Sequence, residues 1–197
     1  LALDRVKQTL AAAGMDFRHM VFVNPYLTKA MPMDVMNRVY AKHFEFGNTP
    51  ARATIQVASL PSGANIEFTG VAIRDLSKRR AVRPQNMPPS PTASPCVFAD
   101  DTLFCSAKSG FIPGPNGGIF AGDVENQVRQ TMRNLLDGLE EAGMDFSNVV
   151  ASNVYVDDLT EFAKMNGVYG KYFAAEPPAR TTVAPLPTVD RKRNQSG

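Results

Sequence analysis

The feature that most constrains this chain is an internal repeat. Residues 14–17, Gly-Met-Asp-Phe, recur as residues 143–146, an offset of 129 positions. The same offset aligns a further set of identical residues, in which Val21, Asn24, Tyr26, Met36, Asn37, Val39, Tyr40, Lys42 and Phe44 match Val150, Asn153, Tyr155, Met165, Asn166, Val168, Tyr169, Lys171 and Phe173. One residue is then dropped, and Pro50-Ala51-Arg52 aligns with Pro178-Ala179-Arg180. Gene duplication with retained core residues explains the apolar matches, but it explains Asn37/Asn166 and Arg52/Arg180 less well.

The first copy predicts alternating helices and strands. Apolar residues at helical spacing open the chain, and Gly14 is typical of a helix stop. Residues 18–27 are rich in Val, Phe and Tyr, as expected for a strand. A second helix is predicted to begin at about Pro32, where proline is favoured in the first turn. The turn Pro61-Ser62-Gly63 joins two apolar segments, which we interpret as a hairpin. The predicted elements are helices at about 1–13 and 32–44 and strands at 18–27, 54–57 and 66–73.

The second copy adds a segment in front of the same pattern. Two short apolar strands flank Asp100-Asp101 and predict an opening hairpin, which a glycine-rich loop follows at residues 109–118. A long helix then carries its apolar residues on one face. The predicted elements are strands at 96–99 and 102–107, a helix whose apolar face runs from Val124 to Leu139, a strand at about 148–156, a helix at about 160–173 and a strand at Arg180.

These patterns divide the chain into two incomplete repeats. Residues 1–75 form the first, which lacks an opening hairpin, and residues 96–197 form the second, which lacks a closing hairpin. Residues 76–95 hold a basic cluster and five prolines, so we interpret them as a linker. We therefore expect an α/β chain of two tandem repeats, with helices packed on one face of a mixed sheet, truncated from a longer tandem protein.

Composition narrows the possible partners. The net charge is +2, which gives no electrostatic argument for nucleic acid or membrane as a partner. No apolar run reaches the roughly 18 residues of a membrane span. The two cysteines are too few for a disulfide scaffold, and no Cys/His spacing resembles a metal site. We expect a cytoplasmic protein with reduced cysteines, no metal and no cofactor.

Several longer motifs resemble one known family. They are NVYVDDLTEFAKMNGVYGKYF from Asn153, followed by PPARTTV, the loop SGFIP from Ser109, the helix QVRQTMRNLLDGLEEAG, and PARATIQVASLPSGANIEF from Pro50. This combination resembles the RidA (reactive intermediate deaminase) family, also labelled L-PSP endoribonuclease. The resemblance implies a chorismate-mutase-like fold, homotrimers with ligand clefts between subunits, and hydrolysis of 2-imino acids to 2-oxo acids and ammonia.

The resemblance also implies a set of site residues. Arg52 and Arg180 occupy the family's carboxylate-binding position, and a guanidinium suits that role because its planar fork binds a carboxylate bidentately. Glu67, 15 residues after Arg52, matches the general acid–base of the deaminases, and we expect it near Arg52 across the predicted hairpin. The equivalent spacing in the second copy reaches Gln195, to which we assign no role. Ser109 matches a ligand-contacting serine, although a turn residue is an equal interpretation.

Three further pairs of residues complete the candidate site. Asn37 and Asn166, with Tyr40 and Tyr169, match the family's Asn-x-x-Tyr helix; Thr54 and Thr182 stand where deaminases often carry Cys. The tyrosines more often serve core packing, with a satisfied hydroxyl. The replacement of Cys by Thr54 weakens the assignment of substrate. It does not weaken the expectation that Arg52 and Arg180 each bind a carboxylate, an arrangement that we call the carboxylate clamp.

Three functions remain open at this point. The first is a 2-iminobutanoate/2-iminopropanoate deaminase-type hydrolase, acting on a small imino acid. The second is a non-catalytic protein that binds a small carboxylate metabolite. An endoribonuclease is less favoured, because RNA cleavage usually needs paired acid–base groups and a basic groove, and neither lies near Arg52. In each case we expect self-association as a trimer or a pseudo-hexamer.

Overall fold

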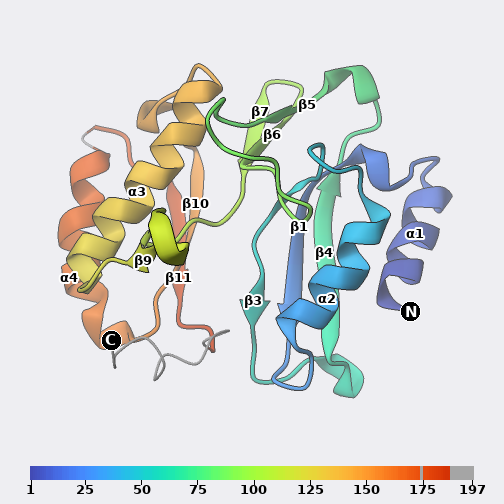
Figure 1. Ribbon diagram of the computed structural model, residues 1–197, viewed down its shortest axis with the longest axis horizontal. Coiled ribbons are helices and arrows are strands. Elements are labelled where there is room, and N and C mark those ends of the chain that lie inside the picture. Colours follow the sequence, from blue (N-terminus) through green and yellow to red (C-terminus); the bar gives the residue numbers. More distant parts are fainter. Residues whose placement is uncertain (174, 187–197) are drawn as a thin grey trace. The chain divides into compact units, whose positions relative to one another are not determined.

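The computed structural model describes residues 1–173 and 175–186, and it divides into two compact α+β units. Unit 1 comprises Leu1–Ala107 together with Leu186, and unit 2 comprises Lys108–Pro185 (Figure 1). The duplicated elements recur between them: α2 (Met33–Tyr40) and α4 (Phe162–Tyr169) have the same bounds at the 129-residue offset. The repeat in the sequence is therefore also a repeat in structure.

The sheet of unit 1 is built around β1 (Met20–Leu27). Strands β2 (Ala51–Arg52) and β3 (Ile55–Gln56) pair with one edge of β1 in parallel, and β4 (Ile66–Ala72) pairs with the other edge in antiparallel. The predicted hairpin of β3 and β4 is therefore wrong, because β1 lies between them. The connecting residues 57–65 pass around the end of β1, where Val57 donates to Leu27 and Thr28 donates to Asn65.

One face of this sheet is covered by helices. Helix α1 (Ala2–Ala12) and α2 lie against it, and their buried side chains join those of β1 in one apolar core (Figure 1). That core consists of Leu3, Leu10, Met20, Val23, Leu27, Met36 and Tyr40. The apolar spacing that predicted the helices therefore marks the residues that face the sheet.

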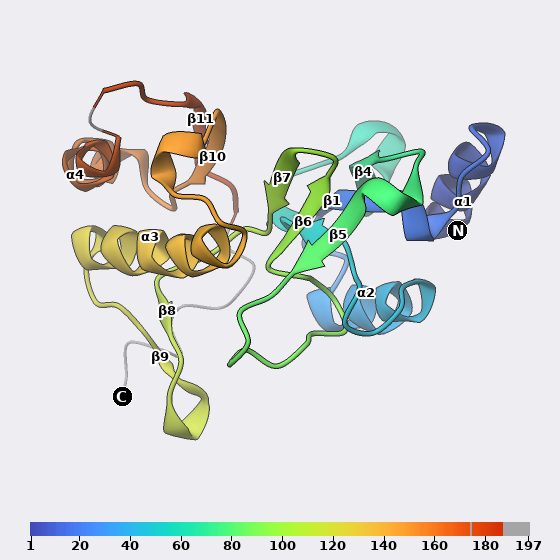
Figure 2. The ribbon, with the colours of Figure 1, turned by 90° about the horizontal axis from the view of Figure 1, so that it is seen from above.

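The three-stranded sheet β5 (Arg79–Val82), β6 (Cys96–Ala99) and β7 (Thr102–Cys105) packs on a second apolar cluster of unit 1. Val21, Ala51 and Val97 are fully buried in this cluster (Figure 2 shows the sheet from above). Residues 79–82, which we expected in a linker, thus form a strand, and the hairpin of residues 96–105 lies in unit 1. That pairing depends on contacts distant in sequence, which a local pattern does not reveal.

The two cysteines form a disulfide, so the expectation of reduced cysteines is wrong for this structure. Cys96 and Cys105 face each other in the register of β6 and β7, and their Cα atoms are 4.0 Å apart. Directly opposed residues of an antiparallel pair come this close where the backbone does not hydrogen-bond between them. The sequence gives the separation of the two cysteines but not this register.

Unit 2 contains the second helix–strand–helix–strand pattern. Its elements are β8 (Phe111–Ile112), β9 (Ile119–Phe120), α3 (Val124–Glu141), β10 (Ala151–Tyr155), α4 and β11 (Ala179–Val183). Strands β10 and β11 pair in parallel, and α3 and α4 form a core around Met132, Met165 and Tyr169. Within the described residues β10 has no counterpart of β4 beside it.

Short 3-10 segments join these elements. They are Phe17–His19, Ala41–His43, Pro61–Gly63, Leu76–Lys78, Pro115–Gly117, Phe146–Asn148, Leu159–Glu161 and Gly170–Tyr172. Asp16 and Asp145 begin equivalent segments, each as half of a capping box. The local chain geometry before β1 and β10 is therefore also duplicated.

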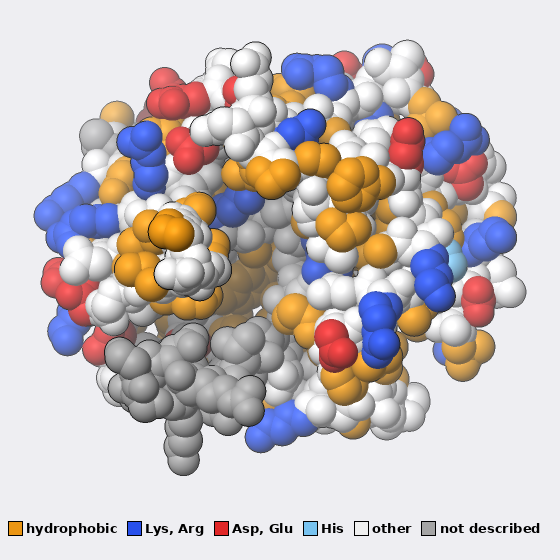
Figure 3. Space-filling view, viewed as in Figure 1, with side chains coloured by type: hydrophobic (Ala, Val, Ile, Leu, Met, Phe, Trp, Pro, Cys, Tyr) orange, Lys and Arg blue, Asp and Glu red, His pale blue; other side chains and the backbone are white. Residues whose placement is uncertain are grey.

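Two surface features complete the description. Apolar side chains gather at the surface over the β8–β9 hairpin (Figure 3), where Ile119 is 66% exposed and Phe120 is 51% exposed. Among the helices of the described residues, none is long and apolar enough to cross a membrane.

Candidate ligand-binding site

Arg52 is placed against the helical face of unit 1 by the register of β2. Arg52 pairs with Val23 of β1, and paired residues in a sheet point to the same side. Val23 lies in the helix-facing core, so Arg52 also faces the helices. Its guanidinium carbon is 4.9 Å from the centre of the Tyr40 ring, and Nη1 is 3.8 Å from the Met36 sulfur. The structure therefore brings together two of the residues singled out in the sequence, Arg52 and Tyr40.

The Arg52 guanidinium has no carboxylate partner among the described residues. Burial lowers the pKa of Arg52, and the same burial raises the pKa of Tyr40. None of the ion pairs among the described residues includes Arg52. Buried charges in proteins are normally paired, because removing a charge from water is costly. An anion at this position would supply the missing partner.

Unsatisfied polar atoms occur on the candidate site residues of each unit. Over residues 1–173 and 175–186, the buried side-chain oxygen or nitrogen atoms without a hydrogen-bond partner are Asn37 Oδ1, Tyr40 OH, Thr54 Oγ1, Asn166 Oδ1 and Thr182 Oγ1. All of them belong to residues that the sequence had singled out for ligand binding. Buried polar groups are nearly always paired, so a ligand that hydrogen-bonds to them is the simplest explanation.

Thr54 shares the face of Arg52. The register of β1 with its parallel neighbours advances evenly from Val23↔Arg52 to Tyr26↔Ile55. Alternate residues of an extended segment point to the same side, so Thr54 follows Arg52 on the helical face. Asn37 precedes Tyr40 by three residues on α2, a spacing that places both on neighbouring parts of one helix surface.

Unit 2 repeats this arrangement. The Arg180 guanidinium carbon is 4.8 Å from the centre of the Tyr169 ring and 5.4 Å from that of Phe162. Arg180 likewise takes part in none of the ion pairs found in the described residues. The tyrosine differs between the copies, because the Tyr169 hydroxyl lies 2.6 Å from Ser152 Oγ, whereas Val23 occupies the position equivalent to Ser152.

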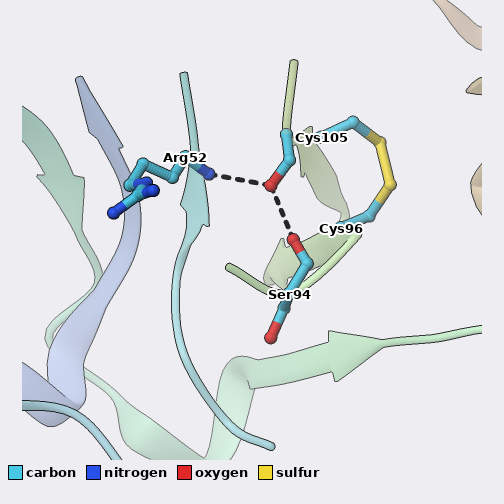
Figure 4. The surroundings of a disulfide bond; sticks show 5 residues. Arg52, Ser94, Cys96 and Cys105 are labelled. Atoms are coloured by element: carbon cyan, nitrogen blue, oxygen red, sulfur yellow. Dashed lines mark hydrogen bonds between the residues drawn. A yellow bond between two sulfur atoms is a disulfide. The ribbon is translucent and has the colours of Figure 1, made fainter. Parts of the chain in front are cut away.

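The backbone of Arg52 is held by residues that the sequence did not indicate. Its N–H donates to Ser106 Oγ at 2.8 Å, and Ser106 Oγ donates to the carbonyl of Ser94 at 2.6 Å (Figure 4). The carbonyl of Arg52 accepts from the N–H of Ala107 at 3.1 Å. No pattern near Arg52 reveals these partners, since they lie more than 40 residues away in the sequence.

Glu67 does not meet Arg52 within unit 1. Glu67 of β4 pairs with Tyr26, three residues along β1 from Val23, the partner of Arg52. Because successive residues alternate between the faces, Glu67 and Arg52 lie on opposite sides of the sheet. Glu67 is exposed, whereas the predicted hairpin would have placed the two side chains close together.

Within the described residues, no hydrogen bond joins Ser109 to either arginine. Ser109 is exposed in unit 2, and its carbonyl accepts a hydrogen bond from Asn134 of α3. Gln195 lies outside the described residues. Among those residues, no group of His, Cys, Asp or Glu side chains is arranged to hold a metal ion.

A surface cavity lies at the other end of β1. It has a volume of about 540 Å³, and none of the predicted site residues lines it. Its walls are Thr28, Lys29, Ala30, Ala58, Ser59, Leu60, Gly63, Ala64, Asn65 and Leu186. The unpaired arginine and polar atoms therefore identify a site that this cavity does not include.

Comparison with known families gives one match across both units. The family model described as Endoribonuclease L-PSP matches residues 1–74 and 86–187. The chain is 38% identical over 96 residues to the chloroplastic Reactive Intermediate Deaminase A of Arabidopsis thaliana, covering 48% of the chain and 51% of that protein. It is 35% identical over 100 residues to human 2-iminobutanoate/2-iminopropanoate deaminase, covering 50% of the chain and 72% of that protein.

A third relative is Protein DfrA of Myxococcus xanthus, 48% identical over 62 residues, or 32% of the chain and 47% of that protein. The chain thus spans about half the length of two of these relatives. Among solved structures, a chorismatase matches 94% of the chain and 64% of its own, with a TM-score of 0.70 and 14% identity. This likeness concerns the fold alone, and it confirms the predicted chorismate-mutase-like fold.

Proposed function

Because the chain belongs to the endoribonuclease L-PSP family, also called the RidA family, we propose that it hydrolyses small 2-imino acids to 2-oxo acids and ammonia. One observation carries this proposal. The Arg52 guanidinium is part-buried, stacks on Tyr40, pairs with none of the described carboxylates and lies near unpaired polar atoms. A small ligand with a carboxylate satisfies all of these groups together.

The binding step follows from the geometry of the groups. The guanidinium fork of Arg52 takes the substrate carboxylate in two parallel charge-assisted hydrogen bonds. The hydroxyls of Tyr40 and Thr54 each offer one donor and further acceptors to the polar end of the ligand. Arg180 offers the same fork in unit 2, with Thr182 as the corresponding hydroxyl.

Hydrolysis requires a group that carries two protons in turn. A carboxylate removes a proton from water as the oxygen adds to the imine carbon and passes it to the nitrogen, which gives a tetrahedral amino alcohol. The same carboxylate then takes the hydroxyl proton of the amino alcohol and delivers it to the nitrogen as the C–N bond breaks, leaving a 2-oxo acid and ammonia. We assign this role to Glu67, reaching the Arg52 site of another chain in a trimer or pseudo-hexamer, since Glu67 is exposed on the opposite face.

The names of the relatives support the choice of substrate. The human relative is a 2-iminobutanoate/2-iminopropanoate deaminase, and the plant relative is a reactive intermediate deaminase. We include a cytoplasmic location in the proposal. In that compartment a disulfide such as Cys96–Cys105 would be transient, because cytosolic thiol systems reduce most disulfides.

A second function is a non-catalytic binder of small carboxylates. The observation that favours it is the separation of Glu67 from Arg52 within the unit, which puts the predicted acid–base group on the face opposite Arg52. Thr54 and Thr182, which stand where the deaminases of the family often carry Cys, point in the same direction. Both functions share the carboxylate clamp.

The decisive experiment measures ammonia released from freshly generated 2-iminobutanoate or 2-iminopropanoate. Arg52→Ala should reduce kcat/KM by about 30-fold or more, because a bound carboxylate loses its charged partner. Glu67→Gln should abolish turnover and spare the binding of 2-oxobutanoate. Arg80→Ala is the matched control, since Arg80 also stacks on a ring, 4.7 Å from the centre of Phe98, but outside the site.

The possible outcomes separate the two functions. Full activity in both Arg52→Ala and Glu67→Gln would overturn the deaminase assignment. An inactive wild type that gains thermal stability from 2-oxobutanoate, and loses this gain in Arg52→Ala, would establish the binder instead.

A further inference from the structure

The disulfide of unit 1 closes the open end of a hairpin. Strands β6 and β7 join through Asp100-Asp101, and Cys96 and Cys105 form the pair farthest from that turn. Beyond the disulfide, one backbone hydrogen bond continues the pairing, from Ser106 N–H to the carbonyl of Pro95 at 2.9 Å. The disulfide therefore holds together the two chain segments that leave the hairpin.

Those two segments hydrogen-bond to residues 49–52, the segment that ends at Arg52. Ser94, two residues before Cys96, donates its N–H to the carbonyl of Pro50 at 3.3 Å, and its hydroxyl lies 3.3 Å from the hydroxyl of Thr49. On the other side, Ser106 follows Cys105 directly and accepts from the Arg52 N–H. Figure 4 shows Ser94 and the disulfide on the same side of the Arg52 backbone. We call Ser94 and Ser106 the serine clasp.

The serine clasp is internally linked and buried. Ser106 Oγ donates to the Ser94 carbonyl at 2.6 Å, so the two halves are bonded to each other as well as to the Arg52 segment. Ser94 and Ser106 are each 5% exposed. If the segments separated, the Arg52 N–H would lose its partner, and a buried donor without a partner is costly. The position of Arg52 thus depends on the hairpin end staying closed.

We propose that the Cys96–Cys105 disulfide is a redox control of the Arg52 site, acting through the serine clasp, whose serines are positioning residues. The inference rests on the carboxylate binding proposed above for Arg52. In the oxidised form the hairpin end is closed and Arg52 is held for ligand binding. In the reduced form the segments separate more often, and the affinity for a carboxylate falls.

The redox step involves a dithiol as the reductant. A thiolate of the dithiol attacks the sulfur of Cys105, the less buried residue, because Cys96 is 1% exposed whereas Cys105 is half-buried. This gives a mixed disulfide and releases the Cys96 thiolate. The second thiol of the reagent then displaces Cys105. Two electrons and two protons pass to the protein as two thiols, and the reagent leaves as a disulfide.

The first test measures amide hydrogen exchange by NMR in the oxidised chain and after reduction with dithiothreitol. Reduction should accelerate exchange of the Arg52 and Ala107 amides about tenfold, the equivalent of one lost hydrogen bond. The Ala179 amide of unit 2, which donates to Val150 at 3.1 Å, is the internal control and should not change. Equal exchange of Arg52 in both redox states would overturn the proposal.

The second test measures affinity for 2-oxobutanoate in an Arg180→Ala background, which leaves only the unit 1 site. Reduction should weaken binding about tenfold, and Ser106→Ala should do the same in the oxidised chain. Ser106→Thr, which keeps the hydroxyl, should restore affinity, and Ser77→Ala at an exposed serine should have no effect. The double variant Cys96→Ser/Cys105→Ser should match the reduced chain and ignore the reductant.

The two tests distinguish failure of this inference from failure of the proposed function. No binding by the oxidised chain would remove the carboxylate function, while the exchange of Arg52 would still decide whether the disulfide controls the clasp. Binding of equal strength in both redox states would remove the redox control and leave the carboxylate function intact.

Discussion

Units 1 and 2 contain the same Arg–Tyr arrangement in two different surroundings. In unit 1, Val21 is fully buried beneath the β5–β7 sheet, whereas its duplicate Val150 is 79% exposed in unit 2. Yet the distances from guanidinium to tyrosine ring agree closely, 4.9 Å in unit 1 and 4.8 Å in unit 2. One helix and one parallel strand pair are therefore enough to bring the arginine over the tyrosine ring in both units.

The largest expected difference between the units concerns burial of the duplicated valine. Val21→Asp places a charge in a dry core and should cost at least about 3 kcal/mol of unfolding free energy. Val150→Asp, at an exposed position, should stay within about 0.5 kcal/mol of wild type. Urea denaturation followed by circular dichroism measures both. Equal losses would mean that Val150 is covered in solution, and the contrast would then have to be abandoned.

A second prediction compares the affinities of the two clamps. Tyr40 keeps a free hydroxyl for a ligand, whereas the Tyr169 hydroxyl is already bonded to Ser152. We therefore expect the unit 1 site, isolated by Arg180→Ala, to bind 2-oxobutanoate about tenfold more tightly than the unit 2 site, isolated by Arg52→Ala. Titration calorimetry on the two variants measures this ratio. A tighter site in unit 2 would contradict the role given to Tyr40.

A third prediction removes the hydroxyl from each tyrosine. Tyr169→Phe leaves Ser152 without its partner and should cost about 1 kcal/mol of unfolding free energy. Tyr40→Phe removes an unpaired buried hydroxyl, so the ligand-free protein should lose nothing and should bind the ligand less well. Thermal denaturation with and without 2-oxobutanoate distinguishes the cases. A ligand-free loss of similar size in Tyr40→Phe would show that its hydroxyl has a partner in solution.

The smallest predicted difference concerns the duplicated capping aspartates. The Arg18 side chain lowers the pKa of Asp16 from 3.8 to about 2, whereas Ser147, at the position of Arg18, lowers the pKa of Asp145. A depressed pKa stabilises the fold above the unfolded value, and this stability is lost as pH falls from about 4 toward 2. Because Asp16 is solvent-exposed, the contribution of its ion pair should be well below about 1 kcal/mol.

Salt separates the two aspartates. High ionic strength should raise the NMR-measured pKa of Asp16, since it screens the charge of Arg18, and should leave that of Asp145 nearly constant, since its partner is neutral. A salt shift of equal size at both carboxyl groups would show that the capping geometry, and not Arg18, sets the pKa of Asp16.

The sequence predicted the local elements of the fold. Helices α2 and α4 and strand β1 follow from apolar spacing and the repeat, because these depend on neighbours along the chain, whereas the choice of Arg52, Arg180, Tyr40 and Tyr169 as site residues came from the resemblance to the family. The order of the strands could not be predicted in this way, because nothing local in residues 54–73 shows that β1 separates β3 from β4. The same limit applies to Ser106, which holds Arg52 from a distant hairpin, and to the register that opposes Cys96 and Cys105.

The position of the β6–β7 hairpin in unit 1 has a consequence for how this gene can be divided. In the sequence the hairpin belongs to the second copy, because it directly precedes the helices of that copy. In the structure its strands cover Val21 and Ala51 of the first copy. A fragment ending at residue 95 would expose these side chains to water and should be recovered in inclusion bodies. One ending at Ala107 keeps them covered. Recombination with a related gene should therefore succeed at residues 107–108 and fail at residues 95–96.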